Sequence, residues 1–470
     1  MLFNSAEFLI FLPIVFAVYW LMNKKRRLQN LWVVVASYLF YGWWDWRFLL
    51  LIAFTSGLSW LSGMQIEDGH KPKLWLWLSV VVNLAILGLF KYYDFFASEL
   101  AELLGISSDR VLLNLVLPVG ISFYTFQALS YTIDVYKHKI EPTRDIVAYF
   151  AYVSLFPQLV AGPIERATNL LPQFLTQRRF DYTQAVDGIR QMLWGFFMKM
   201  AVADRCGWYV DQVWADYTNC SGSQLLIAAV LFAIQIYGDF AGYSNIAIGC
   251  AKLFGINLRQ NFRTPYFSRD IAEFWRRWHI SLTTWFRDYL YIPLGGSRVG
   301  KAKVVRNIFI IFLVSGLWHG ANWTFLAWGA YNALLFLPLI LLGRNRQHTD
   351  TVAEGRLLPS WKELAQMLLT FVLCTIGWII FRADSIDTAI DFIAHLFHCG
   401  NNVANITLPW LTVVFILVMF VAEWFNRNHE HGLNLHAVHP TLVRVLIYYA
   451  LTIVILLYST HSENFIYFQF

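Results

Sequence analysis

Apolar runs of roughly 15 to 21 residues recur along the whole chain, as expected of helices that cross a hydrocarbon core about 30 Å thick. The composition agrees, because 58% of the 470 residues are hydrophobic and only 14% are charged, whereas about a quarter of a soluble domain is charged. We therefore predict an all-α polytopic membrane protein, with residues 1–470 forming a single membrane domain. The predicted membrane segments are 8–22, 31–44, 48–64, 74–90, 111–133, 146–162, 186–203, 224–250, 304–318, 323–342, 364–381, 406–425 and 442–459.

The segment 111–133 is too polar to cross a bilayer as a regular helix, since it contains Pro118, Gly120 and Gln127. Irregular or re-entrant backbone at membrane depth is tolerated only inside protein or beside a water-filled cavity. The sequence therefore predicts that the membrane domain encloses such a cavity.

The distribution of basic residues predicts the topology. The basic cluster at 24–27 follows the first apolar run, whereas in a signal peptide it would precede it, so we expect a first helix that is retained. Lys and Arg collect on the cytoplasmic side, which places the N-terminus outside and the basic segment 255–306 inside. Milder basic excesses at 344–362 and 427–444 place the C-terminal end outside as well. The net charge of +6 then reflects topology, and we expect no nucleic-acid partner.

Within the basic segment, apolar residues recur at spacings near 3 and 4, as on one face of a helix. They are Ile271, Phe274, Trp275, Trp278, Leu282 and Trp285. The pattern predicts a basic, Trp-rich amphipathic helix that lies along the membrane surface. Arg276 and Arg277 belong to it and could bind an anionic donor molecule such as a coenzyme A phosphate, although basic residues at this face are also ordinary topology signals.

His319 stands between two apolar runs, and the run 304–318 that leads into it covers only about 22 Å of a core near 30 Å. The histidine is therefore expected at membrane depth, where polar residues are costly and mark functional sites. A neutral imidazole can take a proton from a hydroxyl near neutral pH, so we predict that His319 is a general base in the cavity. The alternative is a histidine that hydrogen-bonds a neighbouring helix for packing. We expect Trp318 and Asn322 to line the site or orient the ring.

Two further polar residues are candidates. His279, in the predicted surface helix, is either a second polar group that orients the donor or an interfacial histidine beside two arginines. Asp239 lies in an apolar run near Tyr243, with glycines on both sides. An intramembrane carboxylate in this setting predicts a helix kink that lines the cavity, or else a structural ion pair with an arginine.

Several other site classes are not indicated. The histidines in two groups lack the spacing of a zinc site, and the five cysteines show no CxxC pairing, so no metal is predicted. The groups are His429, His431, His436 and His439, and His395 and His398 with Cys399. The sequence has no nucleophile elbow, phosphate-binding loop or redox motif, which argues against hydrolase, nucleotidase and electron-transfer functions.

Seven stretches occur in an order that points to one family. They are MLFNSAEFLIFLPI, FYTFQALSYTIDVYK, LFPQLVAGPIER, IQIYGDFAGYSNIAIG, NFRTPYFSRDIAEFWRRWHISLTTWFRDYLYIPLGG, SGLWHGANWTFLAWG and the closing FIYFQF. With these the chain resembles the membrane-bound O-acyltransferase (MBOAT) family, in its bacterial branch of alginate and peptidoglycan O-acetyltransferase-like proteins, over essentially its whole length. The resemblance implies a ring of tilted helices around a thinned central cavity, with the family's catalytic histidine at His319 and its second characteristic histidine at His279.

The same resemblance gives an interpretation of the C-terminal aromatic tail, residues 460–470. In the D-alanylation relatives, a small companion protein ends in a similar motif whose tyrosine is proposed to carry the acyl group. Tyr467 would then be an acyl carrier whose phenol is deprotonated by His319. The alternative is an aromatic anchor at the membrane interface.

As a function, the resemblance implies transfer of an acyl group, in the first place acetyl, from the cytoplasm to an extracytoplasmic polysaccharide. The protein would lie in the bacterial inner membrane with no bound cofactor, and acetyl-CoA or another acyl donor would be the co-substrate. Expected partners are membrane lipid, the polysaccharide and a periplasmic SGNH-type acetyltransferase. The alternative is a transporter or scaffold that exports an acyl group or lipid without catalysing transfer.

Overall fold

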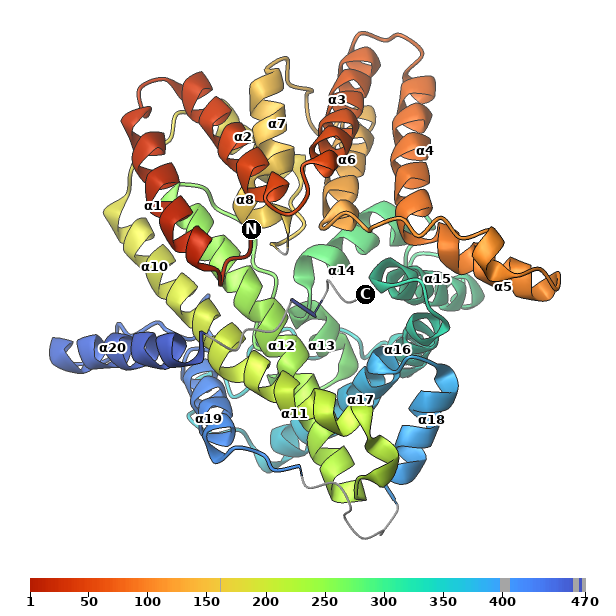
Figure 1. Cartoon of the computed structure of the whole chain (residues 1–470), viewed down its shortest axis with the longest axis vertical. Helices are drawn as coiled ribbons and strands as arrows, with labels where there is room; N and C mark the ends of the chain where they lie inside the picture. The colour runs from red at the N-terminus through yellow and green to blue at the C-terminus, as the bar shows by residue number, and fades with distance from the viewer. Residues whose placement is uncertain (161, 398–405, 460–464, 467–470) are drawn as a thin grey trace. The chain divides into compact units, whose positions relative to one another are not determined.

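The computed structural model describes the chain except for residues 161, 398–405, 460–464 and 467–470, and in the described part helices are joined by turns and loops, with no strand (Figure 1). The α-helices are α1 (Ala6–Leu21), α2 (Arg26–Gly42), α3 (Arg47–Glu67), α4 (Pro72–Lys91), α5 (Tyr93–Leu103), α6 (Ile121–Tyr136), α7 (Ile146–Ser154), α8 (Phe156–Leu159), α9 (Ala167–Leu175), α10 (Tyr182–Phe196), α11 (Asp204–Ala215), α12 (Gly222–Leu253), α13 (Ile271–Arg277), α14 (Ile280–Phe286), α15 (Lys301–His319), α16 (Trp323–Leu341), α17 (Trp361–Arg382), α18 (Ile386–His395), α19 (Trp410–Phe425) and α20 (Thr441–Tyr458).

The prediction of an all-α polytopic membrane protein is confirmed. Seven of the described helices are long and apolar enough to cross a membrane, namely α3, α4, α12, α15, α16, α17 and α20. Each coincides with a predicted segment, and the apolar helices α1 and α19 are shorter. In the polar segment 111–133, helix α6 begins only at Ile121, after Gly120 with a left-handed φ of 74°. This is the irregular backbone that the sequence predicts there.

The chain divides into two compact units. One comprises Met1–Met192 and Ile246–Arg259, and the other comprises Leu193–Asn245 and Gln260–Phe470. The single domain and the ring of helices around a cavity stay predictions.

In the first unit, α3, α4 and α6 are joined by buried hydroxyl groups. The Ser79 hydroxyl lies 3.0 Å from that of Thr132 and 3.5 Å from that of Ser59, so one serine links three helices. Small hydroxyl residues allow close approach of membrane helices and supply hydrogen bonds where lipid offers none.

In the second unit, α15 and α16 form a tightly packed helical pair. A Cβ added at Gly316 would collide with the backbone oxygen of Phe325, and one added at Gly329 would collide with that of Phe312. Glycine is therefore required at both positions for the helices to approach this closely. The contact fixes the end of α15, which is the residue His319.

The predicted amphipathic helix over 271–285 is wrong as a single surface helix. The structure breaks it into α13 and α14 at Trp278 and His279, and His279 has a left-handed φ of 43°. Its apolar residues are buried within the second unit, with Trp278 only 1% exposed. The apolar face is thus covered by protein. The spacing of the apolar residues stays helical across the break at Trp278 and His279, so the sequence pattern does not reveal that the helix ends there.

A π-helical segment, Phe197–Ala203, follows α10 and carries a buried lysine. The Lys199 ammonium group lies 2.7 Å from Oδ1 of Asp204 and 2.7 Å from Oδ1 of Asp239, and all three side chains are at most 3% exposed. Gly242 of α12 permits this approach, because a Cβ there would lie 2.8 Å from the backbone oxygen of Gly195. Asp239 is therefore paired with a lysine, where the sequence suggested an arginine as one alternative.

Candidate active site

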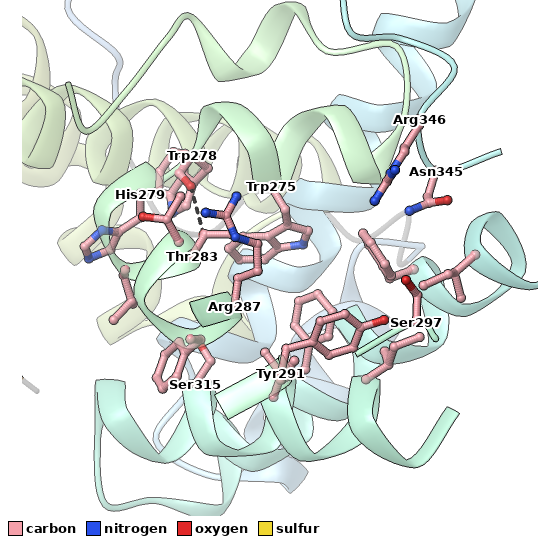
Figure 2. A pocket seen from close by; sticks show the side chains of 18 of the residues that line it. Trp275, Trp278, His279, Thr283, Arg287, Tyr291, Ser297, Ser315, Asn345 and Arg346 are labelled. Atoms are coloured by element: carbon pink, nitrogen blue, oxygen red, sulfur yellow. Dashed lines mark hydrogen bonds between the residues drawn. The ribbon is translucent and has the colours of Figure 1, made fainter. Parts of the chain in front are cut away.

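The second unit contains a cavity of about 260 Å³ that brings His279 and His319 onto one surface. Its lining comes from α13, α14, a π-helical turn at Arg287–Tyr291, α15, α16 and the loop after α16. Apolar side chains such as Ile308, Phe312 and Phe336 form much of this lining. In Figure 2, His279 lies toward one end of the pocket, and Asn345 and Arg346 lie side by side toward the other.

His319 is the last residue of α15 and is 4% exposed. Aromatic rings approach its imidazole edge to face, with centroids at 5.2 Å for Trp328 and 5.3 Å for Phe381. These contacts hold the ring at the pocket in an apolar environment. The predicted placement of His319 at a buried cavity agrees with the structure.

His279 is 1% exposed and is held by an amide. Its Nδ1 lies 3.1 Å from Oδ1 of Asn261, an oxygen that also accepts the Ser281 hydroxyl at 2.9 Å and the Ser281 backbone N–H at 3.4 Å. An amide oxygen only accepts, so Nδ1 carries the proton and Nε2 keeps its lone pair. Among the residues that the structure describes, Nε2 has no hydrogen-bond partner.

Burial lowers the pKa of His279 to about 3. The imidazole is therefore neutral at physiological pH, the form that accepts a proton or a hydrogen bond at Nε2. Its left-handed backbone is of the strained kind that clusters at functional sites. Both features favour a functional histidine over an interfacial one.

Trp318 lies between the two histidines. Its ring centroid is 5.7 Å from that of His279 and 5.1 Å from that of His319. Asn322, by contrast, caps α16, since its side chain accepts the Thr324 N–H at 3.0 Å and donates to the Asp384 carbonyl at 3.0 Å. The described lining of the pocket does not include Asn322.

Asp239 and Tyr243, both predicted to line the cavity, lie on α12 away from the described lining of this pocket. Oδ2 of Asp239 accepts the backbone N–H of Ile466 at 2.7 Å, and the Tyr243 ring contacts that of Phe465 with centroids 4.3 Å apart. These two residues therefore contact the C-terminal tail. Tyr467 itself lies outside the described residues.

Arg276 and Arg277, the predicted donor-binding residues, contact a loop. Arg276 donates to the carbonyl groups of Asn345 and His348 at 2.6 Å each, and Arg277 donates to the carbonyl of Asp350 at 2.9 Å. The arginines that line the pocket are Arg287 and Arg346. Sequence reasoning missed both because they are far apart in the chain and meet only in the fold, although Arg287 follows directly on the Trp-rich pattern.

Among the described residues, no three His, Cys, Asp or Glu side chains come together as metal ligands. The polar groups that line the pocket include two imidazoles, two guanidinium groups and several hydroxyl groups. One of these hydroxyl groups belongs to Tyr291, whose side chain is directed toward Ser297 in Figure 2. Such a set suits proton transfer and the binding of an anion.

Comparison with known families gives a match over residues 72–381 to the membrane-bound O-acyltransferase model. The chain belongs to the membrane-bound O-acyltransferase family. The MBOAT resemblance predicted from the sequence is confirmed. The protein is therefore an acyltransferase, and its spanning helices make it a multi-pass membrane protein.

The relatives of this MBOAT chain include polymer-modifying enzymes. It is 39% identical to the probable alginate O-acetylase AlgI of Pseudomonas aeruginosa, over 91% of this chain and 83% of that protein. It is 32% identical to the peptidoglycan O-acetyltransferase of Helicobacter pylori, over 83% and 78% respectively. The teichoic acid D-alanyltransferase of Bacillus subtilis is 26% identical, over 57% and 69%.

Proposed function

We propose that this acyltransferase moves an acetyl group from a cytoplasmic donor across the bacterial inner membrane for O-acetylation of an extracytoplasmic polysaccharide. The names of its relatives, an alginate O-acetylase and a peptidoglycan O-acetyltransferase, support acetyl as the group and a polymer as the eventual acceptor. The observation that carries the proposal is the shared pocket of His279 and His319, whose lining also includes Arg287 and, toward the far end in Figure 2, Arg346.

His319 is the proposed general base. It takes the proton of the acceptor hydroxyl as the acceptor oxygen forms a bond to the acyl carbon. The bond between the acyl carbon and the donor's leaving group then breaks, and the leaving group takes the proton from His319. His279 offers Nε2 to hydrogen-bond and orient the reacting groups, because Nδ1 is occupied by Asn261.

Arg287 and Arg346 are the proposed contacts for an anionic donor such as acetyl-CoA. Both line the pocket, and guanidinium groups bind phosphate through paired hydrogen bonds. Because His279 and Arg346 lie toward opposite ends of the pocket in Figure 2, a donor can place its acyl end near the histidines and its anionic end near the loop. In this proposal Arg276 acts indirectly, by bonding the loop at Asn345, the residue before Arg346.

Tyr467 is the proposed acyl carrier between donor and polymer. Its phenol would attack the acyl carbon while His319 takes the phenolic proton, because a phenol with a pKa near 10 is a poor nucleophile when protonated. The acyl-tyrosine would pass its group outward to a periplasmic SGNH-type acetyltransferase. The distribution of Lys and Arg supports this direction, since by the positive-inside rule it predicts that both termini lie outside.

The decisive experiment is His319→Ala, with polysaccharide O-acetyl content measured in cells that hold equal amounts of membrane protein. Loss of a general base lowers the transfer rate by about 10²- to 10⁴-fold. His436→Ala, at an exposed histidine of the loop before α20, is the matched control and keeps full transfer. Full acetylation by His319→Ala would remove the assignment of the base and favour a transporter or scaffold role.

A further inference from the structure

The described end of the C-terminal tail is bound to α12. Phe465 is 0% exposed and Ile466 is 1% exposed. The Ile466 backbone N–H donates to Oδ2 of Asp239 at 2.7 Å, and the Phe465 ring contacts Tyr243 and Phe240, with centroids at 4.3 Å and 5.9 Å. We call Asp239, Phe240 and Tyr243 the tail site.

The charge at the tail site suits a hydrogen-bond donor. Lys199 contributes one positive charge, and Asp204 and Asp239 contribute two negative charges, all buried. Each carboxylate places one oxygen 2.7 Å from the ammonium group, and Asp239 directs its other oxygen at the tail. A buried anion requires such compensation, and a charged acceptor makes a hydrogen bond roughly twice as strong as a neutral one.

The backbone around Lys199 is adapted to this contact. Lys199 lies in the π-helical segment Phe197–Ala203, and π-helical turns are frequent at functional sites. Gly238 and Gly242 flank Asp239 one turn apart, and a Cβ at Gly242 would lie 3.0 Å from the Lys199 backbone nitrogen. The glycines thus allow the ion pair to form by bringing two backbones together.

The tail site adjoins the candidate active site through one ring. Phe240, which contacts Phe465, also contacts the His279 imidazole edge to face with centroids 4.7 Å apart. Phe465, in the described part of the tail, is therefore separated from the His279 imidazole by the ring of Phe240.

We propose that Asp239 is a positioning residue that binds the backbone of the chain's own C-terminal tail and holds it beside His279 for group transfer. The link to transfer rests on the function proposed above. Binding of the tail is independent of that function.

Asp204 provides a matched control for Asp239. Both carboxylates are buried and bond the same ammonium group at the same distance, and the backbone N–H of Ile466 donates to Asp239. Asp239→Asn and Asp204→Asn each remove one of the two carboxylate charges that lie beside the Lys199 ammonium group. If Asp239 only balanced that charge, the two variants would behave alike.

The experiment measures tail release with N-ethylmaleimide on a Phe465→Cys protein, with the protein lacking that cysteine as background. We expect the Phe465→Cys protein to be labelled slowly. Labelling should be at least tenfold faster in the double variant with Asp239→Asn, and only slightly faster in the double variant with Asp204→Asn. Transfer assays should show kcat reduced in Asp239→Asn with the donor KM unchanged. Equal labelling and equal kcat in the two variants would overturn the proposal.

A second pair of variants alters only the tail. Ile466→Pro removes the N–H that Asp239 accepts, whereas Ile466→Ala shortens the side chain and keeps it. Tail release by proline but not by alanine supports the backbone contact, and equal release overturns it. If Asp239→Asn releases the tail while Tyr467→Phe and His319→Ala keep full transfer, tail binding stands and the proposed function fails.

Discussion

Nδ1 of His279 lies 3.1 Å from Oδ1 of Asn261, which fixes the imidazole with Nε2 as the basic nitrogen. Burial lowers the pKa of His279 to about 3, so the ring stays neutral through the physiological range. Asn261 in turn is oriented by Ser281 and by donation to the Ser244 hydroxyl at 3.2 Å. The position of the proton on Nδ1 of His279 therefore depends on one amide oxygen.

Asn261→Asp tests that dependence through pH. A carboxylate beside Nδ1 favours the imidazolium and raises the pKa of His279. As pH falls, the variant protonates His279 earlier than the wild type, so its transfer rate declines at a higher pH. Rate profiles measured from pH 8 to 5 for the variant and the wild type check this. An unshifted profile would show that Asn261 does not set the state of His279.

Arg287→Ala and Arg346→Ala test the anionic end of the donor. Each should raise the donor KM about tenfold or more, because a hydrogen bond to a charged group is lost, while kcat changes little. The effect should shrink at high salt, since the Arg287 side chain is 58% exposed. Arg298→Ala, at an exposed arginine outside the described pocket lining, should be silent. A larger KM effect from Arg276→Ala would instead favour the donor contact that the sequence suggested.

Gly316→Ala tests the packing that places His319. The added methyl meets the backbone oxygen of Phe325, which cannot rotate away, so α15 must shift three residues before the histidine. We expect a loss of about 1–3 kcal/mol in stability, typical of overpacking. Thermal unfolding in detergent measures it, together with reduced transfer. Gly88→Ala on α4 has open space around its Cβ and should be neutral or slightly stabilising, and equal effects at both sites would contradict this account.

Tyr467→Phe tests the carrier. The change keeps the aromatic ring and removes only the phenolic oxygen, so transfer to polysaccharide should fall to background while the amount of membrane protein is unchanged. Tyr449→Phe, at a tyrosine of α20 that is 65% exposed, controls for loss of a hydroxyl. Unchanged transfer by Tyr467→Phe would leave the tail with an anchoring role alone.

Features that depend on a short stretch of sequence, such as spanning helices, could be predicted from the sequence. Hydropathy located the spanning helices because a bilayer sets their length, and the apolar run before His319 indicated a buried histidine because that run is short. The polar residues of 111–133 indicated irregular backbone for the same reason, since a membrane tolerates few exceptions.

Properties created by folding could not be predicted in this way. The periodicity of 271–285 passes through His279 without a signal, although its left-handed φ ends one helix and begins another. Asn322 adjoins His319 in sequence but caps a helix, while Arg346 is distant in sequence and lines the pocket. Asp239 pairs with Lys199, a residue whose place in a π-helical turn has no sequence signature.

The contact between Asp239 and the N–H of Ile466 recognises a group that every amino acid except proline possesses. Such an anchor places little demand on the identity of the residue it holds. Side chains of the tail can therefore change in evolution, and with them the chemical group that the tail brings to the reaction, while helix α12 and its contact to the tail backbone stay the same.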